Sequence, residues 1–226
     1  MKRFWREAAV VEADGGWSVA LDGKPVRTPA RAALLLPTRA LADAVAGEWA
    51  ACGEEVRPRE MVMTGLANAA IDRVGPEVAA RVAAYGLHDL LCYRAGAPPG
   101  LALRQAAAWE PVLAWAARRY DVAFRLGVGV TPVDQPATTL ARLRTMVDAL
   151  GVFALAGVYP VVSVTGSLVL GLALIERAIE AEAAWAAGEV DADWQAEQWG
   201  DDPLAAASRD ERRAALMAGA RFIRLI

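Results

Sequence analysis

The stretch GVFALAGVYPVVSVTGSLVLGLALI, residues 151–175, decides the fold class because it contains no charged residue over 25 positions. A run of this length could in principle cross a bilayer as a helix. Pro160 lies in its middle, however, and residues 163–167 bring two serines, a threonine and a glycine. These residues divide the stretch into apolar runs of about 11 and 8 residues, lengths that are typical of buried core helices. The pattern therefore favours a pair of core helices over a membrane span.

The rest of the chain has the composition of a globular protein. Hydrophobic residues make up 56% of the 226 residues and charged residues 23%, unlike the composition of disordered chains. The net charge of −3 provides no global basic field to hold nucleic acid. Cys52 and Cys92 lie 40 residues apart without the spacing of a zinc site. Their separation favours a reduced compartment and predicts no structural metal.

The first third of the chain predicts a small β-rich unit. Apolar or alternating runs at residues 4–11 and 17–21 flank an Asp-Gly-Gly turn. Thr38 is placed to cap the helix that follows. Residues 61–63 are expected to form a last short strand before the chain becomes helical.

The segment LDGKPVRTPAR, residues 21–31, gathers basic side chains around an Asp-Gly pair and raises the question of a phosphate site. Asp-Gly is a strong signal for a two-residue hairpin. In that register Lys24 and Arg27 face opposite sides of the strand, so the basic groups do not converge. Pro25 falls at a non-hydrogen-bonded position, which suits an edge strand. The segment is therefore interpreted as a hairpin and not as an anion site.

From residue 76 onward the hydrophobic period becomes helical. One helix is predicted over residues 76–95, and another over residues 103–120 with a kink or division at Pro111. The predicted fold class is α+β. A small β-rich N-terminal domain would span residues 1–74, and a larger, mainly α-helical domain would span residues 75–226.

One pair of side chains could carry catalysis. His88, the only histidine, precedes Cys92 by four residues on the helix predicted here. That spacing would place an imidazole and a thiol on one helix face. An inert core thiol explains the same pattern, and no dinucleotide-binding, Walker, GxSxG or HExxH motif occurs. A small enzyme using this pair stays an alternative, and no cofactor or small-molecule substrate is expected.

Residues 176–202 combine acids with tryptophans. Nine acids stand there against one base, Arg177. At protein interfaces aromatic rings supply contact area, and charges supply steering and specificity. A solvated acidic face with Trp anchors in the core explains most of these acids, but the cluster WQAEQWGDD, residues 194–202, favours contact with a partner. The candidate partner-binding residues are Glu180, Asp193, Trp194, Glu197, Trp199, Asp201 and Asp202.

Several segments, taken in order, resemble a known family over nearly the whole chain. They are RFW, LDGKPVRTP, PTRALADAVAGEW, MTGLANAAID, DLLCYRA, QAAAWEPVLAWA, SLVLGLALI and WQAEQWGDD. This ordered set resembles the ATP synthase assembly chaperones of the ATP-twelve type. The resemblance implies a non-enzymatic chaperone that binds the free α subunit of the catalytic head and shields the surface that later meets the β subunit. The chaperone would then be displaced as the α/β hexamer assembles.

The resemblance also implies a functionally important acid in the C-terminal helices. It corresponds to Glu197, with Asp193 as the second candidate. The lack of a predicted presequence and the composition rich in Ala and Arg favour a bacterial homologue in the cytoplasm, and for eukaryotic relatives the expected location is the mitochondrial matrix. An unrelated protein-interaction module is the other alternative.

Overall fold

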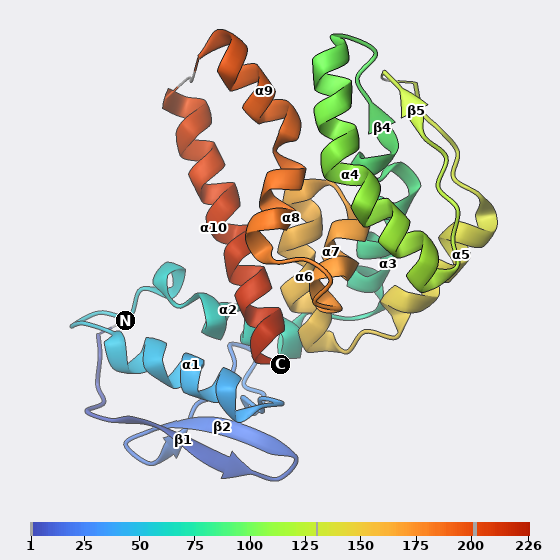
Figure 1. Ribbon diagram of the computed structural model, residues 1–226. Helices are drawn as coiled ribbons and strands as arrows, with labels where there is room; N and C mark the ends of the chain where they lie inside the picture. The colour runs from blue at the N-terminus through green and yellow to red at the C-terminus, as the bar shows by residue number, and fades with distance from the viewer. Residues whose placement is uncertain (1, 130, 201–202) are drawn as a thin grey trace.

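The N-terminal part is a three-stranded antiparallel sheet covered by helices (Figure 1). This computed structural model describes residues 2–129, 131–200 and 203–226. Helix α1 packs against β1 and β2, which are the first two strands in the sheet order β1-β2-β3. The elements are β1 (Ala8–Ala13), β2 (Gly16–Leu21), β3 (Lys24–Pro25), α1 (Arg39–Ala51), the 3-10 turn η1 (Pro58–Glu60) and α2 (Val62–Asp72).

The predicted Asp-Gly hairpin is confirmed. Leu21 pairs with Lys24 and Ala20 with Pro25, and both turn residues have a positive φ, as this turn type requires. The Asp22 carboxylate accepts hydrogen bonds of 2.9–3.2 Å from the backbone N–H groups of the two residues before β1. The hairpin therefore also holds the N-terminal segment in place.

The strand predicted over residues 61–63 is wrong, because α2 begins at Val62. The N–H groups of Met63 and Thr64 donate to the Glu48 carboxylate of α1 at 2.7 and 2.8 Å. A carboxylate at this position satisfies free N–H groups and interacts favourably with the helix dipole. A partner from another helix thus decides that this apolar run is helical.

The helical part follows and confirms the α+β fold class. Its short strands β4 and β5 form a parallel pair. Pro111 lies inside α4 and does not divide it into two helices. The elements are α3 (Pro76–Ala84), the 3-10 turns η2 (Tyr85–His88) and η3 (Leu90–Cys92), β4 (Tyr93–Arg94), α4 (Pro99–Tyr120), β5 (Gly127–Val128), α5 (Ala137–Asp148), α6 (Val152–Thr165), α7 (Leu168–Ile175), α8 (Ala181–Gly188), α9 (Val190–Trp199) and α10 (Pro203–Leu225).

The charge-free stretch forms two buried helices, α6 and α7, as predicted, but Pro160 lies inside α6 and does not divide the stretch. The break lies at Gly166, which has a left-handed φ of 69°, and at Ser167, whose Oγ caps α7 by accepting the N–H of Leu170 at 3.1 Å. Glycine tolerates this conformation and serine is a preferred N-cap. In the described part of the chain, no helix has the length and apolar character that crossing a bilayer requires.

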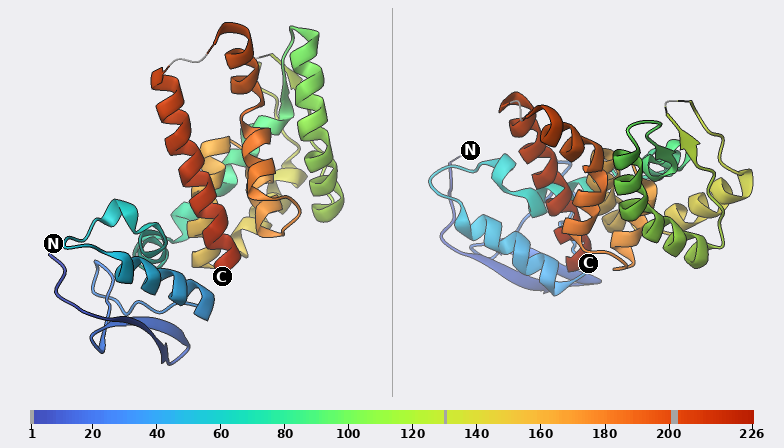
Figure 2. Two further views of the ribbon diagram at one scale, coloured as in Figure 1. Left: turned by 60° about the vertical axis from the view of Figure 1, so that its left-hand side comes forward. Right: turned by 45° about the horizontal axis from the view of Figure 1, so that its top comes forward.

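Two buried hydrophobic clusters are connected through α6 and α10. The N-terminal cluster includes Ala156 of α6 and Phe222 of α10, and other residues of the same two helices belong to the cluster of the helical part. Helix α10 runs along the helical part, and its C-terminal end lies beside α1 and α2 (Figure 2). There the Thr38 hydroxyl caps α1 as predicted and also donates to the Leu225 carbonyl. The domain boundary after residue 74 stays a prediction.

Candidate protein-binding face of the C-terminal helices

The candidate residues lie mainly on α9, which stands between α4 and α10 (Figure 1). Helix α9 packs against α4 and α8. The first turns of α4 and α10 and the last turn of α9 lie at the same end of the molecule, far from the N-terminal sheet (Figures 1 and 2). Residues Leu103, Trp199 and Leu204 in these turns are 71%, 79% and 81% exposed. Large apolar side chains are thus presented to solvent at this end.

Glu197 forms a bidentate ion pair with Arg104 of α4. The two N–O distances are 2.7 and 2.9 Å, and both side chains are substantially exposed. The hydrogen bonds from Arg104 lower the pKa of the Glu197 carboxyl below its ordinary value. Glu197 is therefore held ionised and fixed in direction by the fork geometry of the guanidinium.

Trp194 of α9 packs against α4 beside the Glu197–Arg104 ion pair. The Arg104 guanidinium lies 5.1 Å from the centre of the indole ring, within the range of a cation–π interaction. The ring also rests on Gly100, where a Cβ atom would come within 2.9 Å of it. Trp194 is half-buried and is engaged within the chain, so it offers a partner less area than Trp199 does.

Asp193 and Glu189 bind arginines of α10. Arg209 forms ion pairs with both acids, and Arg212 pairs with Glu189 at 2.5 Å. Glu189 is only 3% exposed. Both guanidinium groups also lie within 6 Å of the centre of the Trp185 ring. This cluster, centred on the buried Glu189, ties α10 to the junction between α8 and α9.

The remaining acids of the region that the structure describes also have partners within the chain. The contacts are Glu176 with Arg119 and Tyr120, Glu180 with Arg224 at 3.8 Å, Glu182 with Arg213 at 2.7 Å and Asp191 with Gln105 at 2.6 Å. Residues 176–202 contain a single base of their own. The arginines that neutralise their acids come from α4 and α10. No local pattern could reveal these pairings. Asp201 and Asp202 lie outside the described residues.

A groove of about 590 Å³ separates α9 from the first turns of α10. Its walls carry the small side chains of Ala192 and Ala196 on α9 and of Ala205 and Ala206 on α10. Trp199 and charged residues of α10, among them Arg209 and Arg212, line it as well. The groove therefore combines room for a side chain or helix with an exposed aromatic ring, a combination that protein interfaces favour.

The proposed Cys92–His88 pair is wrong. The helix predicted over residues 76–95 ends at Ala84, and the chain continues as two 3-10 turns separated by an extended Asp89. Cys92 is fully buried, and burial raises its pKa to about 12. The His88 ring is hydrogen-bonded to the Tyr93 hydroxyl. A buried, protonated thiol is a poor nucleophile.

The buried Asp89 carboxylate explains this local structure. One oxygen accepts the N–H of Leu91 at 3.0 Å, and the other accepts the N–H of Val169 in α7 at 2.9 Å. Burial raises the Asp89 pKa to about 6, against the opposing effect of these hydrogen bonds. Asp89 thus has a structural role between η3 and α7. No group of three or more His, Cys, Asp or Glu residues in the described ranges is arranged to hold a metal ion.

The fold and the sequence are similar to those of known chaperones. Residues 2–117 match the ATP12 chaperone protein family. Atp12 from Paracoccus denitrificans is 43% identical and superposes with a TM-score of 0.95, covering 99% of this chain and 97% of that chain. A variant of the Paracoccus protein with one Asp replaced by Lys gives the same TM-score at 42% identity, with 99% and 97% coverage. The Atu1473 protein of Agrobacterium tumefaciens is 39% identical with a TM-score of 0.93, covering 99% of this chain and 85% of that chain. The chain therefore belongs to the ATP12 chaperone family, and its role is that of a chaperone in ATP synthase assembly.

Proposed function

We propose that this chaperone binds the free α subunit of the ATP synthase catalytic head through the end of its helical part. It covers the surface of the α subunit that later meets the β subunit, and it leaves when the β subunit binds. The observation that carries the proposal is Trp199, 79% exposed beside the groove between α9 and α10. A soluble monomer seldom exposes so large a ring without a use for it.

The physical need for such a contact follows from assembly. A subunit whose interface is not yet covered exposes apolar surface and aggregates at moderate concentration. A temporary partner needs apolar area for affinity and a polar rim for specificity. Trp199 and the alanine side chains of the groove supply the apolar area. The paired acids on α9 supply the polar rim.

Within this proposal, Glu197 and Asp193 act mainly by holding α9 in position. Because both are paired to arginines inside the chain, they contribute directed dipoles and little net charge. Reversing the charge at Glu197 would place a lysine against Arg104 and push the end of α9 away. The groove and Trp199 would then be misplaced although the cores stay intact.

Aggregation of the α subunit tests the proposal. Free α subunit is diluted from denaturant, and light scattering is recorded with the chaperone and with its variants. We expect Trp199→Ala and Glu197→Lys to lose most of the protection while keeping a native circular dichroism spectrum.

Two control variants test whether the loss of protection is specific to the α9–α10 face, because they make similar changes elsewhere on the surface. Leu126→Ala removes another exposed apolar side chain, and Asp148→Lys reverses another Arg-paired acid, on α5. Both should protect like the wild type. If Trp199→Ala protects fully, the face assignment is wrong. If the wild type neither protects nor co-purifies with the α subunit, the choice of partner is wrong.

Displacement needs no nucleotide hydrolysis, because β only has to bind the same surface with a more favourable free energy. Adding the β subunit to a preformed chaperone–α complex should release free chaperone in size-exclusion chromatography, with or without a non-hydrolysable ATP analogue. A stable ternary complex would contradict displacement by competition.

A further inference from the structure

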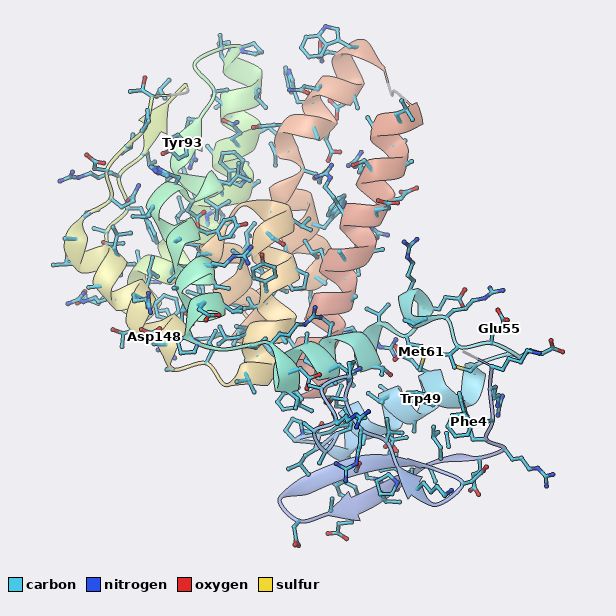
Figure 3. All side chains as sticks on the ribbon, turned by 180° about the vertical axis from the view of Figure 1, so that it is seen from behind. Phe4, Trp49, Glu55, Met61, Tyr93 and Asp148 are labelled. Carbon is cyan, nitrogen blue, oxygen red and sulfur yellow. The ribbon has the colours of Figure 1, made fainter. Side chains whose placement is uncertain are left out.

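A second hollow lies on the N-terminal part, away from the α9–α10 groove. It is a cleft of about 800 Å³ between α1, residues 52–61 and Arg221 of α10. Figure 3 shows the neighbourhood: Trp49, Met61, Glu55 and Phe4 gather at this edge of the molecule. The cleft is thus built from three separate segments of the chain and is not a gap within one loop.

The floor of the cleft is small and apolar. Ala44, Gly47 and Ala51 lie three and four residues apart on α1 and therefore share one helix face. A Cβ atom at Gly47 or at Gly53 would meet no atom within 4 Å. The cleft therefore has unoccupied room over the helix surface, where a polypeptide backbone could approach closely.

The rim of the cleft is acidic. Its lining contains the five carboxylates of Asp43, Glu48, Glu54, Glu55 and Glu60, and the two guanidinium groups of Arg57 and Arg221. The lining therefore carries a formal charge of −3.

Part of this charge is neutralised within the chain. Glu48 is bound by the N-terminus of α2, and Glu60 pairs with Arg57 at 3.1 Å. In the described part of the chain, Glu54 and Glu55 form no ion pair. These two exposed carboxylates at one end of the cleft are therefore available to a cation.

An exposed aromatic ring lies near these carboxylates. Phe4 is 70% exposed, and its ring packs edge-on against Trp5, which packs in turn against Trp49 of α1. A smaller hollow continues the cleft toward this segment, and Trp5, Glu54 and Glu55 line it together with Lys2 and Arg3. The Arg3 guanidinium donates to backbone carbonyl groups and not to these carboxylates. Apolar and acidic groups are thus presented along one path, with two basic side chains at its outer end.

From these features we propose that the cleft binds an extended polypeptide segment that carries Lys or Arg side chains, donated by the client of the chaperone. The small floor of α1 accepts the backbone of the segment, Glu54 and Glu55 pair with its cations, and Phe4 covers an apolar side chain. Complementary charge provides specificity and speeds association, while the apolar contacts supply affinity. Only the identity of the client rests on the proposed function; the chemistry of the cleft does not.

The test uses the full chain and two synthetic peptides. One is a fluorescein-labelled peptide of six Lys-Ala repeats, and the other has Glu in place of every Lys. Fluorescence anisotropy measures their affinity. We expect the basic peptide to bind with a Kd that rises with salt, and the acidic peptide not to bind. Equal binding of the two peptides, or binding by neither, would overturn the proposal.

Cys52 reports where the basic peptide binds. Its thiol lines the cleft and is partly exposed, whereas Cys92 is buried. A bulky maleimide therefore modifies Cys52 alone in the native protein. Saturating basic peptide should slow this reaction several-fold. An unchanged rate, despite peptide binding by anisotropy, would place the peptide elsewhere and contradict the proposal.

Three variants separate the cleft from general electrostatic attraction. Glu54→Lys with Glu55→Lys should abolish binding, and Gly47→Met should weaken it several-fold by filling the floor without changing charge. Glu12→Lys with Asp14→Lys makes the same change of net charge on β1 and on the turn between β1 and β2, outside the cleft. This variant should bind the basic peptide nearly as the wild type does. Equal losses in both charge-reversal variants would contradict the proposal. Since no ATP synthase subunit is present, this outcome is independent of protection of the α subunit.

Discussion

Gly157 of α6 and Gly219 of α10 lie against each other where the two helices cross. A Cβ atom on Gly219 would lie 2.5 Å from the Gly157 carbonyl oxygen and 2.8 Å from Cγ of Pro160. A Cβ atom on Gly157 would lie 2.8 Å from Ile223. The two backbones are therefore in direct contact where α10 packs on α6.

Gly219→Ala should destabilise the protein by about 1–3 kcal/mol, because the added methyl group overpacks a backbone contact that cannot widen without moving a core helix. Urea unfolding followed by circular dichroism measures the change. Gly47→Ala is the control: it lies inside α1 with open space around it and should stabilise by about 0.5–1 kcal/mol. A Gly219→Ala protein as stable as the wild type would contradict the close approach.

Glu189→Ala should cost about 2–4 kcal/mol of unfolding free energy, since it removes a buried carboxylate, leaves Arg212 without its ion-pair partner and leaves Arg209 with Asp193 alone. The loss should appear in denaturant unfolding and as faster amide exchange in the first half of α10. The control is Glu182→Ala, which breaks an exposed pair with Arg213 and should change stability by less than about 1 kcal/mol. Equal effects of the two substitutions would show that burial of Glu189 contributes nothing.

The buried Asp89 predicts a pH-dependent stability. Its pKa of about 6 in the folded protein lies above the ordinary value of 3.8 that the unfolded chain has, so the folded state binds the proton more tightly. Stability contributed at this site is therefore fully present below pH 4 and is lost as the pH rises through 6, on the order of 2–3 kcal/mol in total.

Asp89→Asn isolates this effect because asparagine does not titrate. The difference in unfolding free energy, wild type minus variant, should fall between pH 4 and pH 7 and stay constant above. Urea titrations across this range measure it. A difference that is independent of pH would mean that Asp89 is ionised throughout the range.

Thiol alkylation tests the assignment of Cys92 as an inert core residue. In the native protein, iodoacetamide should modify Cys52 and leave Cys92 untouched even at pH 9, because burial raises the Cys92 pKa to about 12. Both thiols should react in denaturant, and peptide mass spectrometry assigns them. Rapid native labelling of Cys92 would reopen the enzyme alternative.

Several features could be read from the sequence because neighbouring residues decide them. The Asp-Gly hairpin depends on turn residues that accept positive φ. The start of α1 depends on the Thr38 hydroxyl, which accepts a hydrogen bond from the N–H of Leu41, three residues further on. The split of residues 151–175 depends on a glycine and a serine in sequence. In each case the deciding interaction spans only a few residues.

Other features could not be predicted from the sequence, because the residues that decide them are far apart along the chain. Residues 61–63 are not a strand, since Glu48 of another helix binds the N-terminus of α2. The helix predicted over residues 76–95 stops early, since Asp89 is held by an N–H of α7 eighty residues away.

The candidate site shows the same division most clearly. The sequence alone located acids and tryptophans in residues 176–202, and its ordered segments indicated the chaperone family. Only the tertiary structure brought Arg104 to Glu197 and the arginines of α10 to Glu189 and Asp193. Ion pairing depends on distance in space, which separation along the chain does not reveal. The described acids of this region are therefore largely neutralised, and Trp199 is the large apolar side chain that α9 exposes.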